Sequence, residues 1–345
     1  METLLVTPPE TVKLTAHSAP HYIFQRTTYE APRQYVYAIE NAVIEFQHRP
    51  GNRSSFRISQ SLFNHASDAR FDEIAFIDDK YTKFNICHFL FDKLTRLMLL
   101  KKAGILPKAV LLFSRNKYTH YWINQVLGYT PRYIVRDKGT ISTKVLYVVS
   151  SSFHLRHPGN FMPADIVDAL SALGGSSPAH KALYISREDE ATRNVLNEDS
   201  IGEIEKVRAQ DITPSAQRDL FNECSVLVGP HGAGLANLLF MPRGSTVIEI
   251  LPPYYGTAAF YIAAERLGHR YVPIVACDPT DGVGASPKEW THDSTYNRRH
   301  MIADPRAVAD AVSEALSRSG EAAKRPQITG ELDGRTLRGI IAADH

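Results

Sequence analysis

Short blocks of hydrophobic and polar residues alternate along most of the 345-residue chain, and the period of this alternation changes near residue 73. Before that point, residues 35–39 and 55–58 alternate apolar and polar side chains around a Gly51-Asn52 turn, which predicts a few antiparallel strands. After it, short apolar runs alternate with segments of helical period. This pattern is typical of an α/β fold.

The apolar runs predict strands at residues 74–77, 109–113, 132–135, 145–149, 182–186, 226–228, 247–251 and 271–275. The segments of helical period predict helices at residues 86–103, 118–127, 163–173, 214–222, 233–240, 258–267 and 305–317. Both series pause at residues 174–178, Gly-Gly-Ser-Ser-Pro, which has the composition of a linker.

Two series of strands and helices joined by a linker predict two parallel-sheet domains that face a cleft. The expected division is a loosely ordered N-terminus (1–20), an α/β domain with a small β-rich N-terminal extension (21–175), a second α/β domain (176–318) and a flexible tail (319–345). Residues 278–303 read as a long loop.

One segment of the second domain combines a strand, a glycine-rich turn and a helix start. Glycines at 229, 232 and 234 follow the strand at 226–228, and the helix is predicted to open near residue 233. A helix N-terminus offers free N–H groups and a partial positive charge, and glycine lets an anion approach the backbone. The alternative is a tight turn whose glycines only permit close packing. The candidate phosphate contacts are His231, Gly232, Ala233, Gly234 and Leu235.

Polar residues also follow other predicted strands of this domain. Arg187 comes directly after the strand at 182–186, at the carboxyl end of the sheet, where open α/β sheets bind ligands. Ser186 and Arg187 are candidates to bond a diphosphate, and Arg193 would add positive charge. Glu249, near the end of another strand, is a candidate to accept hydrogen bonds from a ribose, or else a salt-bridged structural glutamate.

The helix at 86–103 carries a narrow polar stripe on an otherwise apolar surface. At 100° per residue, Asn85, His88, Asp92 and Arg96 fall within an arc of about 80°. A helix that is apolar almost all round is buried, so the stripe is expected to face an interdomain cleft. His88 and Asp92 are four residues apart and can touch, which suits either a general base or a structural His–Asp pair.

Composition narrows the possible partners. A hydrophobic fraction of 43% and a net charge of +2 are ordinary for a globular protein and give no electrostatic case for nucleic acid. The three cysteines fit no metal spacing and read as reduced thiols, and the start of the chain does not resemble a signal peptide. We therefore expect a cytoplasmic protein with at most peripheral membrane contact. Asp78 and Asp79 could suggest a metal site, but neighbouring strand residues point to opposite faces, so we predict no bound metal.

Three segments, in order, resemble glycosyltransferase family 61. Residues 229–242, Gly-Pro-His-Gly-Ala-Gly-Leu-Ala-Asn-Leu-Leu-Phe-Met-Pro, followed by Val-Ile-Glu-Ile at 247–250, resemble its signature. Residues 85–92 resemble its Asn-x-x-His-x-x-x-Asp helix, and residues 184–187, with Arg193, resemble its Ile-Ser-Arg segment. The resemblance covers roughly residues 70–275. It departs from the family at Phe89, where many members have Trp, and at Ala236, where Thr is common.

This resemblance implies a GT-B fold of two Rossmann-like domains, with an inverting transfer from a nucleotide sugar, usually a UDP-sugar. Asp92 or His88 would act as base, and Asn85 and Arg96 would lie at the acceptor or cleft side. The turn, Ser186 and Arg187 would hold the diphosphate without a metal or other cofactor, and Glu249 would hold the ribose. A bacterial surface polysaccharide such as capsule, lipopolysaccharide or exopolysaccharide is the expected acceptor.

Three other readings stay open at this point. An NAD(P)-dependent oxidoreductase would also use a glycine turn, but the chain has Gly-x-x-Gly-x-Gly late in the sequence and not Gly-x-Gly-x-x-Gly after the first strand. A metal-dependent GT-A transferase would rely on Asp78 and Asp79. A non-catalytic sugar- or nucleotide-binding protein would bind without turnover. The oligomeric state is not predicted.

Overall fold

The structure is a computed structural model. It describes residues 2–7, 10–13, 28–31, 33–47, 55–61, 67–77, 85–112, 116–136, 138–150, 164–174, 179–188, 190–252, 257–279 and 299–324. Outside the described residues lie Asp78, Asp79, half of the predicted N-terminal segment (residues 1, 8–9 and 14–20), residues 175–178 of the predicted linker, residues 280–298 of the predicted loop and residues 325–345. We call residues 2–174 the N-terminal half and residues 179–324 the C-terminal half.

The N-terminal half is built on a mixed seven-stranded sheet. Its order is β1 (Glu2–Thr7), β4 (Gln34–Gln47), β9 (Gly139–Val149), β6 (Ala69–Phe76), β7 (Ala109–Leu112) and β8 (Arg132–Val135), and β5 (Ser55–Gln60) also pairs with β4. The pairs among β6, β7, β8 and β9 are parallel, whereas β4 is antiparallel to β1, β5 and β9.

The expected N-terminal extension is therefore part of this sheet, and the sheet is mixed where a parallel one was predicted. The reason is the length of β4: its 14 residues pair with β5 along one edge and with β9 along the other, as Ile44 does with Ile58 and Ile141. Strands β2 (Glu10–Lys13) and β3 (Thr28–Ala31) form a separate antiparallel pair.

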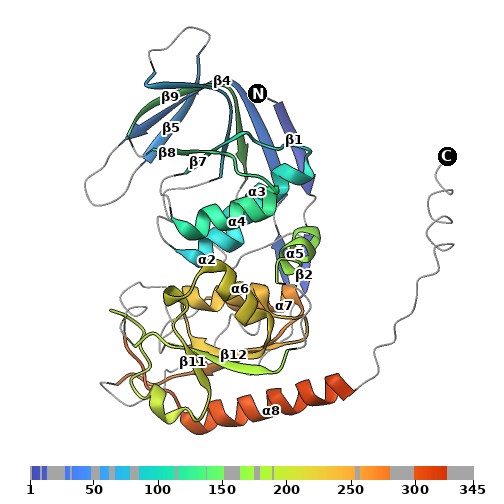
Figure 1. The fold of residues 1–345 in the computed structure, drawn as a ribbon, viewed down its shortest axis with the longest axis vertical. Coiled ribbons are helices and arrows are strands. Elements are labelled where there is room, and N and C mark those ends of the chain that lie inside the picture. Colours follow the sequence, from blue (N-terminus) through green and yellow to red (C-terminus); the bar gives the residue numbers. More distant parts are fainter. Residues whose placement is uncertain are drawn as a thin grey trace, which may run out of the picture.

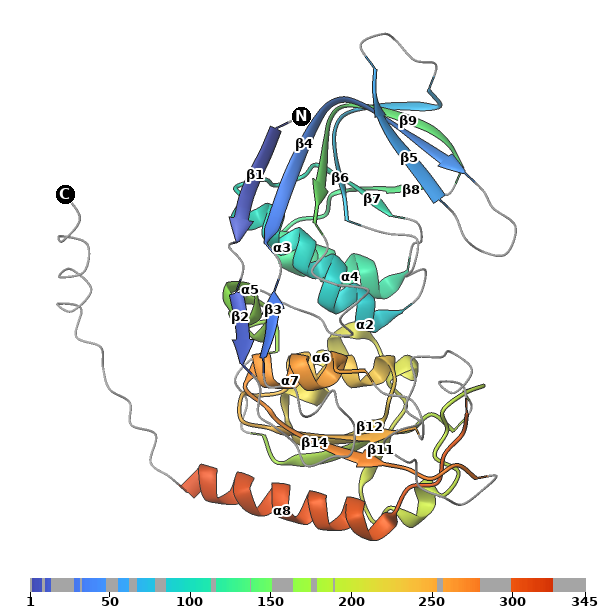
Figure 2. The same cartoon turned by 180° about the vertical axis from the view of Figure 1, so that it is seen from behind.

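One face of this sheet is covered by helices (Figures 1 and 2). The predicted helix at 86–103 is observed as three consecutive pieces: α2 (Ile86–His88), a π-helical turn η1 (Phe89–Lys93) and α3 (Leu94–Lys102). Helix α4 (Lys117–Leu127) begins with a capping box and ends at Gly128, whose φ of 78° suits glycine. Helix α5 (Ala164–Ser171) precedes the C-terminal half.

The C-terminal half contains a five-stranded, fully parallel sheet. Its order is β11 (Glu205–Val207), β10 (Lys181–Ile185), β12 (Cys224–Pro230), β13 (Thr246–Leu251) and β14 (Arg270–Val275). Every residue of β12 and β13 is buried, as expected for parallel strands covered on both faces. Together with the N-terminal sheet, this establishes an α/β protein with parallel strands.

Alternate residues of these strands belong to two cores. Val226 and Val228 pack with α8 (Pro305–Lys324), whereas Leu227 faces a layer that contains α6 (Pro214–Asn222), η4 (Ala233–Phe240) and α7 (Ala259–Leu267). Figure 1 shows α8 beneath the sheet and the other three helices above it, toward the N-terminal half. Short 3-10 turns η2 (Glu198–Ser200) and η3 (Ala209–Asp211) complete the half.

The two halves share one apolar core. The indole of Trp122 in α4 stacks on the ring of Phe240 in η4, with ring centroids 4.6 Å apart and planes at 9°. Helix pairs α2–η4, α4–α6 and α5–α7 also meet across the boundary. The helices thus form two layers between the two sheets (Figure 2). None of the helices in the described part of the chain is long and apolar enough to cross a membrane.

Candidate functional site

A cavity of ≈ 410 Å³ lies between the two halves and is lined by side chains from both. The N-terminal half supplies Asn85, Phe89 and Lys93 from the start of the 86–102 helix, with Lys117 and Tyr118 from α4. The C-terminal half supplies Arg187, Glu190, Gln217, Ala233, Gly234 and Asn237. The cavity therefore lies at the carboxyl ends of β10 and β12, where open α/β sheets bind ligands.

The glycine turn places the start of η4 at this cavity. The helix predicted to open near residue 233 is observed at Ala233–Phe240, but as a 3-10 helix where an α-helix was expected. Ala233 and Gly234 line the cavity, while the Leu235 N–H is bonded to the Gly232 carbonyl at 3.1 Å. The first turn of a helix leaves N–H groups without partners inside the helix, so this end suits an anion.

Arg187 lies against the same turn. A Cβ placed on Gly232 would stand 2.7 Å from Arg187 Nη1, so the guanidinium occupies space that only glycine leaves open. The absence of a side chain at Gly232 is thus what lets the cation approach the helix start. Glycine is needed at position 232 because Arg187 approaches the backbone closely there, and not because the backbone is strained.

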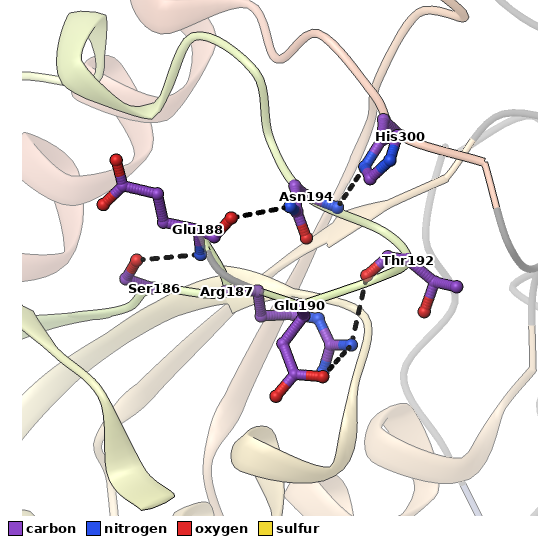
Figure 3. A network of polar contacts seen from close by, with 7 residues as sticks. All are labelled: Ser186, Arg187, Glu188, Glu190, Thr192, Asn194 and His300. Carbon is purple, nitrogen blue, oxygen red and sulfur yellow. Dashed lines mark hydrogen bonds and ion pairs between the residues drawn. The ribbon is translucent and has the colours of Figure 1, made fainter. Parts of the chain in front are cut away.

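The loop after β10 holds Arg187 in place through its own hydrogen bonds (Figure 3). Arg187 Nη2 donates to the Thr192 carbonyl at 3.1 Å, and Asn194 Nδ2 donates to the Glu188 carbonyl at 2.9 Å. The Asn194 N–H in turn donates to His300 Nδ1 at 3.3 Å. These contacts hold residues 186–188 and 190–194 close to the arginine.

The charge of Arg187 is only weakly neutralised. Its ion pair with Glu190 is long, with Nη2 3.8 Å from Oε2, and its Nε is buried without a hydrogen-bond partner among the described residues. Burial lowers the pKa of this guanidinium, an effect that Glu190 partly opposes. A half-buried cation whose Nε donor is unbonded is favourable for binding a phosphate.

Ser186 and Arg193 are placed differently from Arg187. Ser186 Oγ donates to Glu198 Oε1 at 2.8 Å and accepts from the Glu188 N–H, which together hold it inside the protein. Arg193 has a left-handed backbone, with φ 59°, and is half-buried. Neither side chain is among the residues that line the cavity in the described part of the chain.

Glu249 is fully buried, with 0% exposure, and both of its oxygens are bonded within the protein. His231 Nδ1 lies 2.5 Å from Oε1, and the Tyr271 hydroxyl donates to Oε2 at 2.5 Å. Burial, and next the charge of Glu249, raises the pKa of Tyr271 well above its usual value. The expected ribose contact needs an accessible carboxylate, so the structure instead gives Glu249 and His231 the role of fastening β13 to the turn.

The polar stripe of the 86–102 helix is divided by the π-helical turn. Asn85 lines the cavity, and its Oδ1 also caps the helix by accepting from the Cys87 and His88 N–H groups at 3.0 and 3.3 Å. Asp92 is buried in an ion pair with Arg96 at 3.0 Å, and Arg96 Nη1 donates to the Ile77 carbonyl at 3.2 Å. These two residues therefore tie the helix to the end of β6.

In place of the stripe, Phe89 and Lys93 line the cavity in the described chain. Both belong to the π-helical turn, where the extra residue per turn rotates the helix surface relative to a regular α-helix. His88, which is half-buried, precedes this turn. The wheel at 100° per residue therefore identified Asn85 but missed Lys93, a lysine that is only 2% exposed.

Tyr118 and Gln217 join the two halves at the rim of the cavity. The Tyr118 hydroxyl donates to the Ile212 carbonyl at 2.8 Å and accepts from Gln217 Nε2 at 2.7 Å. Burial raises the pKa of Tyr118, an effect that the hydrogen bond from Gln217 partly opposes. Local sequence patterns carry no signal for this pair, because its members are 99 residues apart.

Groups of His, Cys, Asp and Glu side chains suited to a metal ion do not occur within the described ranges. Asp78 and Asp79 lie outside those ranges. A second hollow of ≈ 330 Å³ lies on the N-terminal sheet around Asn41 and Lys144, and it contains none of the predicted site residues.

Comparison with known proteins finds a family and two relatives that are similar to this chain. A family model described as Glycosyltransferase 61 matches residues 86–248. An α-1,3-arabinosyltransferase of Oryza sativa subsp. japonica is 32% identical over 123 residues, covering 32% of this chain and 20% of the relative. A β-1,2-xylosyltransferase of the same plant is 28% identical over 187 residues, covering 47% of this chain and 31% of the relative. The chain thus spans at most about a third of the length of these relatives.

Proposed function

Because residues 86–248 belong to glycosyltransferase family 61, we propose that this chain transfers a sugar from a nucleotide sugar to a hydroxyl group of a glycan. The observation that carries the proposal is the placement of Arg187 against Gly232, directly before η4, in a cavity that Arg187, Ala233 and Gly234 line together with residues of the N-terminal half. The family match spans both walls of that cavity.

The donor diphosphate would bind at the start of η4. Arg187 would pair with its oxygens, and the N–H groups at Ala233 and Gly234 would complete the site. As the bond between the sugar and the phosphate breaks, negative charge grows on the leaving diphosphate. A guanidinium and a helix N-terminus fixed at that place stabilise the charge, so we propose that no metal or other cofactor is needed.

The acceptor would enter from the N-terminal half. A base there removes the proton of the attacking hydroxyl, which displaces the nucleotide in one step with inversion at the anomeric carbon. His88 and Asp92 are the two candidates. Asp92 is buried in its pair with Arg96 and His88 is half-buried, which favours His88 as the more accessible group.

The finer assignments belong to the same proposal: a GT-B arrangement, a UDP-sugar donor, a bacterial surface polysaccharide as acceptor, and action in the cytoplasm or at the inner face of the membrane. The names of the two plant relatives contain arabinosyl and xylosyl, so UDP-pentoses belong among the first donors to test.

We expect UDP to raise the unfolding temperature by a few degrees in the presence of EDTA, because a ligand at 100 times its Kd adds about 2.7 kcal/mol to stability. Arg187→Ala should remove this shift. Arg318→Ala, which changes an exposed arginine of α8, is the matched control and should keep it. Release of UDP from UDP-xylose, UDP-arabinose or UDP-glucose in the presence of glycan acceptors measures the transfer.

Other outcomes would contradict parts of the proposal. A shift with NAD and none with UDP would favour an oxidoreductase. A shift or turnover that requires Mn²⁺ would contradict the metal-independent mechanism. Binding of UDP without turnover of any donor would leave a non-catalytic binding protein as the better description.

A further inference from the structure

Asn237 carries a buried hydrogen-bond acceptor on the wall of the cavity. The residue is 1% exposed, it lines the cavity, and its Oδ1 has no hydrogen-bond partner among the described residues. Its orientation is fixed, because Nδ2 donates to the Gly234 carbonyl at 2.9 Å and only the nitrogen of the amide can do so. The free atom is therefore an oxygen that can accept but not donate.

An acceptor left unpaired in a buried position is costly and calls for a donor. The charged groups on the cavity wall are mostly cationic: Lys93, Lys117 and Arg187 against Glu190. Phosphate oxygens match the cations, but they cannot satisfy Asn237 Oδ1 because they carry no hydrogen to donate. The missing partner is thus a neutral O–H or N–H group of the same ligand.

The position of Asn237 along η4 indicates which part of that ligand it would contact. In a 3-10 helix residues three apart share one face, and the rise is about 2 Å per residue, so Asn237 lies about 6 Å beyond Gly234. The helix start, where the diphosphate is proposed to bind, is therefore one turn away. The η4 helix also contacts α2, and Phe89 and Lys93 of the adjoining π-helical turn line the same cavity.

We propose that Asn237 Oδ1 accepts a hydrogen bond from a hydroxyl group of the sugar that is transferred, and so helps to determine which donor is used. This inference rests on the proposed function. The transferred sugar has to lie between the diphosphate and the N-terminal half that supplies the acceptor, and that is where Asn237 is found. A site built around a hydrogen bond to a hydroxyl discriminates strongly against a ligand that lacks it.

The test compares UDP with UDP-sugars. For each variant, Kd is measured by calorimetry for UDP and for UDP-xylose, UDP-arabinose and UDP-glucose, and the ratio of the UDP value to that of the tightest UDP-sugar is taken. Asn237→Leu, which keeps the shape but removes the acceptor, should lower this ratio by about ten-fold, the factor that corresponds to 1.4 kcal/mol. Binding of UDP itself should change less than two-fold.

Asn222→Leu is the matched control. Asn222 is also buried and also has an Oδ1 without a partner among the described residues, but it does not line the cavity. Its ratio should stay at the wild-type value. An unchanged ratio in Asn237→Leu, or an equal loss for UDP and UDP-sugar, would overturn the assignment to the transferred sugar. Failure of the wild-type protein to bind any of these nucleotides would instead overturn the proposed function.

A second measurement begins with the wild-type protein, so its first part does not depend on the folding of a variant. Wild-type protein is titrated with the monodeoxy analogues of its tightest UDP-sugar, one hydroxyl removed at a time. One of them should bind about ten-fold more weakly than the parent, and that loss should disappear in Asn237→Leu. Equal binding of every monodeoxy analogue to the wild-type protein would refute the inference.

Discussion

Gly232 and Gly234 of the glycine turn leave room for different neighbours. A Cβ on Gly232 would stand 2.7 Å from Arg187 Nη1, the mobile end of a long side chain. A Cβ on Gly234 would stand 2.8 Å from Cγ2 of Ile185, a branched side chain that is buried in the sheet. The first glycine therefore makes room for a functional group, and the second for the core.

This difference predicts opposite effects of the same substitution. Gly232→Ala should displace the guanidinium and weaken UDP binding about ten-fold or more, while the midpoint of urea unfolding stays near the wild-type value. Gly234→Ala should overpack the core and lower the free energy of unfolding by about 1–3 kcal/mol. Urea denaturation and calorimetry with UDP measure both quantities. Identical behaviour of the two variants would contradict this division of roles.

Among the secondary-structure elements, the 86–102 helix shows what periodicity can and cannot predict. The pattern located β8 of the N-terminal sheet and helix α6 at their observed bounds. It located the strands of the C-terminal sheet to within a few residues, with the exception of β11. Strand β11 was missed because two of its three residues, Glu205 and Lys206, are charged and exposed, so it contains no apolar run. The π-helical turn was missed because a wheel assumes a constant rotation per residue, whereas the Leu94 N–H bonds to the carbonyl of Phe89, five residues back.

Residues of the candidate site could be predicted only where their position next to a predicted strand or helix was enough to identify them. Arg187 and the turn at Ala233 and Gly234 were found in that way, since both follow an apolar strand. The contacts of Glu249 and Tyr118 depend on side chains brought from elements far along the chain. Local sequence carries no record of such partners, so their roles needed the fold.

The ion pair at the end of this helix predicts a stability effect separate from catalysis. Asp92→Asn should lower the free energy of unfolding by about 3–5 kcal/mol, because Arg96 is left buried without its carboxylate. Adding Arg96→Met should restore much of that stability, measured by urea denaturation.

If Asp92 is the base, the stable double variant will still fail to transfer sugar. If the double variant regains activity, His88 is the remaining candidate, and His88→Ala should then abolish transfer while UDP still binds.

At the scale of the whole molecule, the two sheets are joined by one buried core and not by a flexible contact. Trp122 and Phe240, from different halves, are both about 1% exposed, and they belong to the same apolar cluster. Buried apolar area of this kind couples the stability of the elements that it joins. The walls of the cavity are thereby held in register by packing as well as by the Tyr118 hydrogen bonds.

We therefore expect a single unfolding transition. Trp122→Ala should lower the free energy of unfolding by about 3–5 kcal/mol. The urea concentrations at which the two sheets unfold should fall by the same amount. Hydrogen exchange of peptides from β9 and β13 during urea unfolding reports on each sheet. Leu106→Ala, at an exposed leucine, is the control and should change little. Different midpoints for the two peptides would show that the halves unfold independently.

The order of strands in the N-terminal sheet has a consequence for synthesis on the ribosome. Strand β9 lies between β4 and β6, yet it follows both of them along the chain by more than sixty residues. Until residue 149 has emerged, β4 and β6 each present an edge that only β9 can cover. Open edges of this kind invite pairing with other chains. During this interval, the extent to which the nascent protein aggregates depends on the speed of translation and on chaperones.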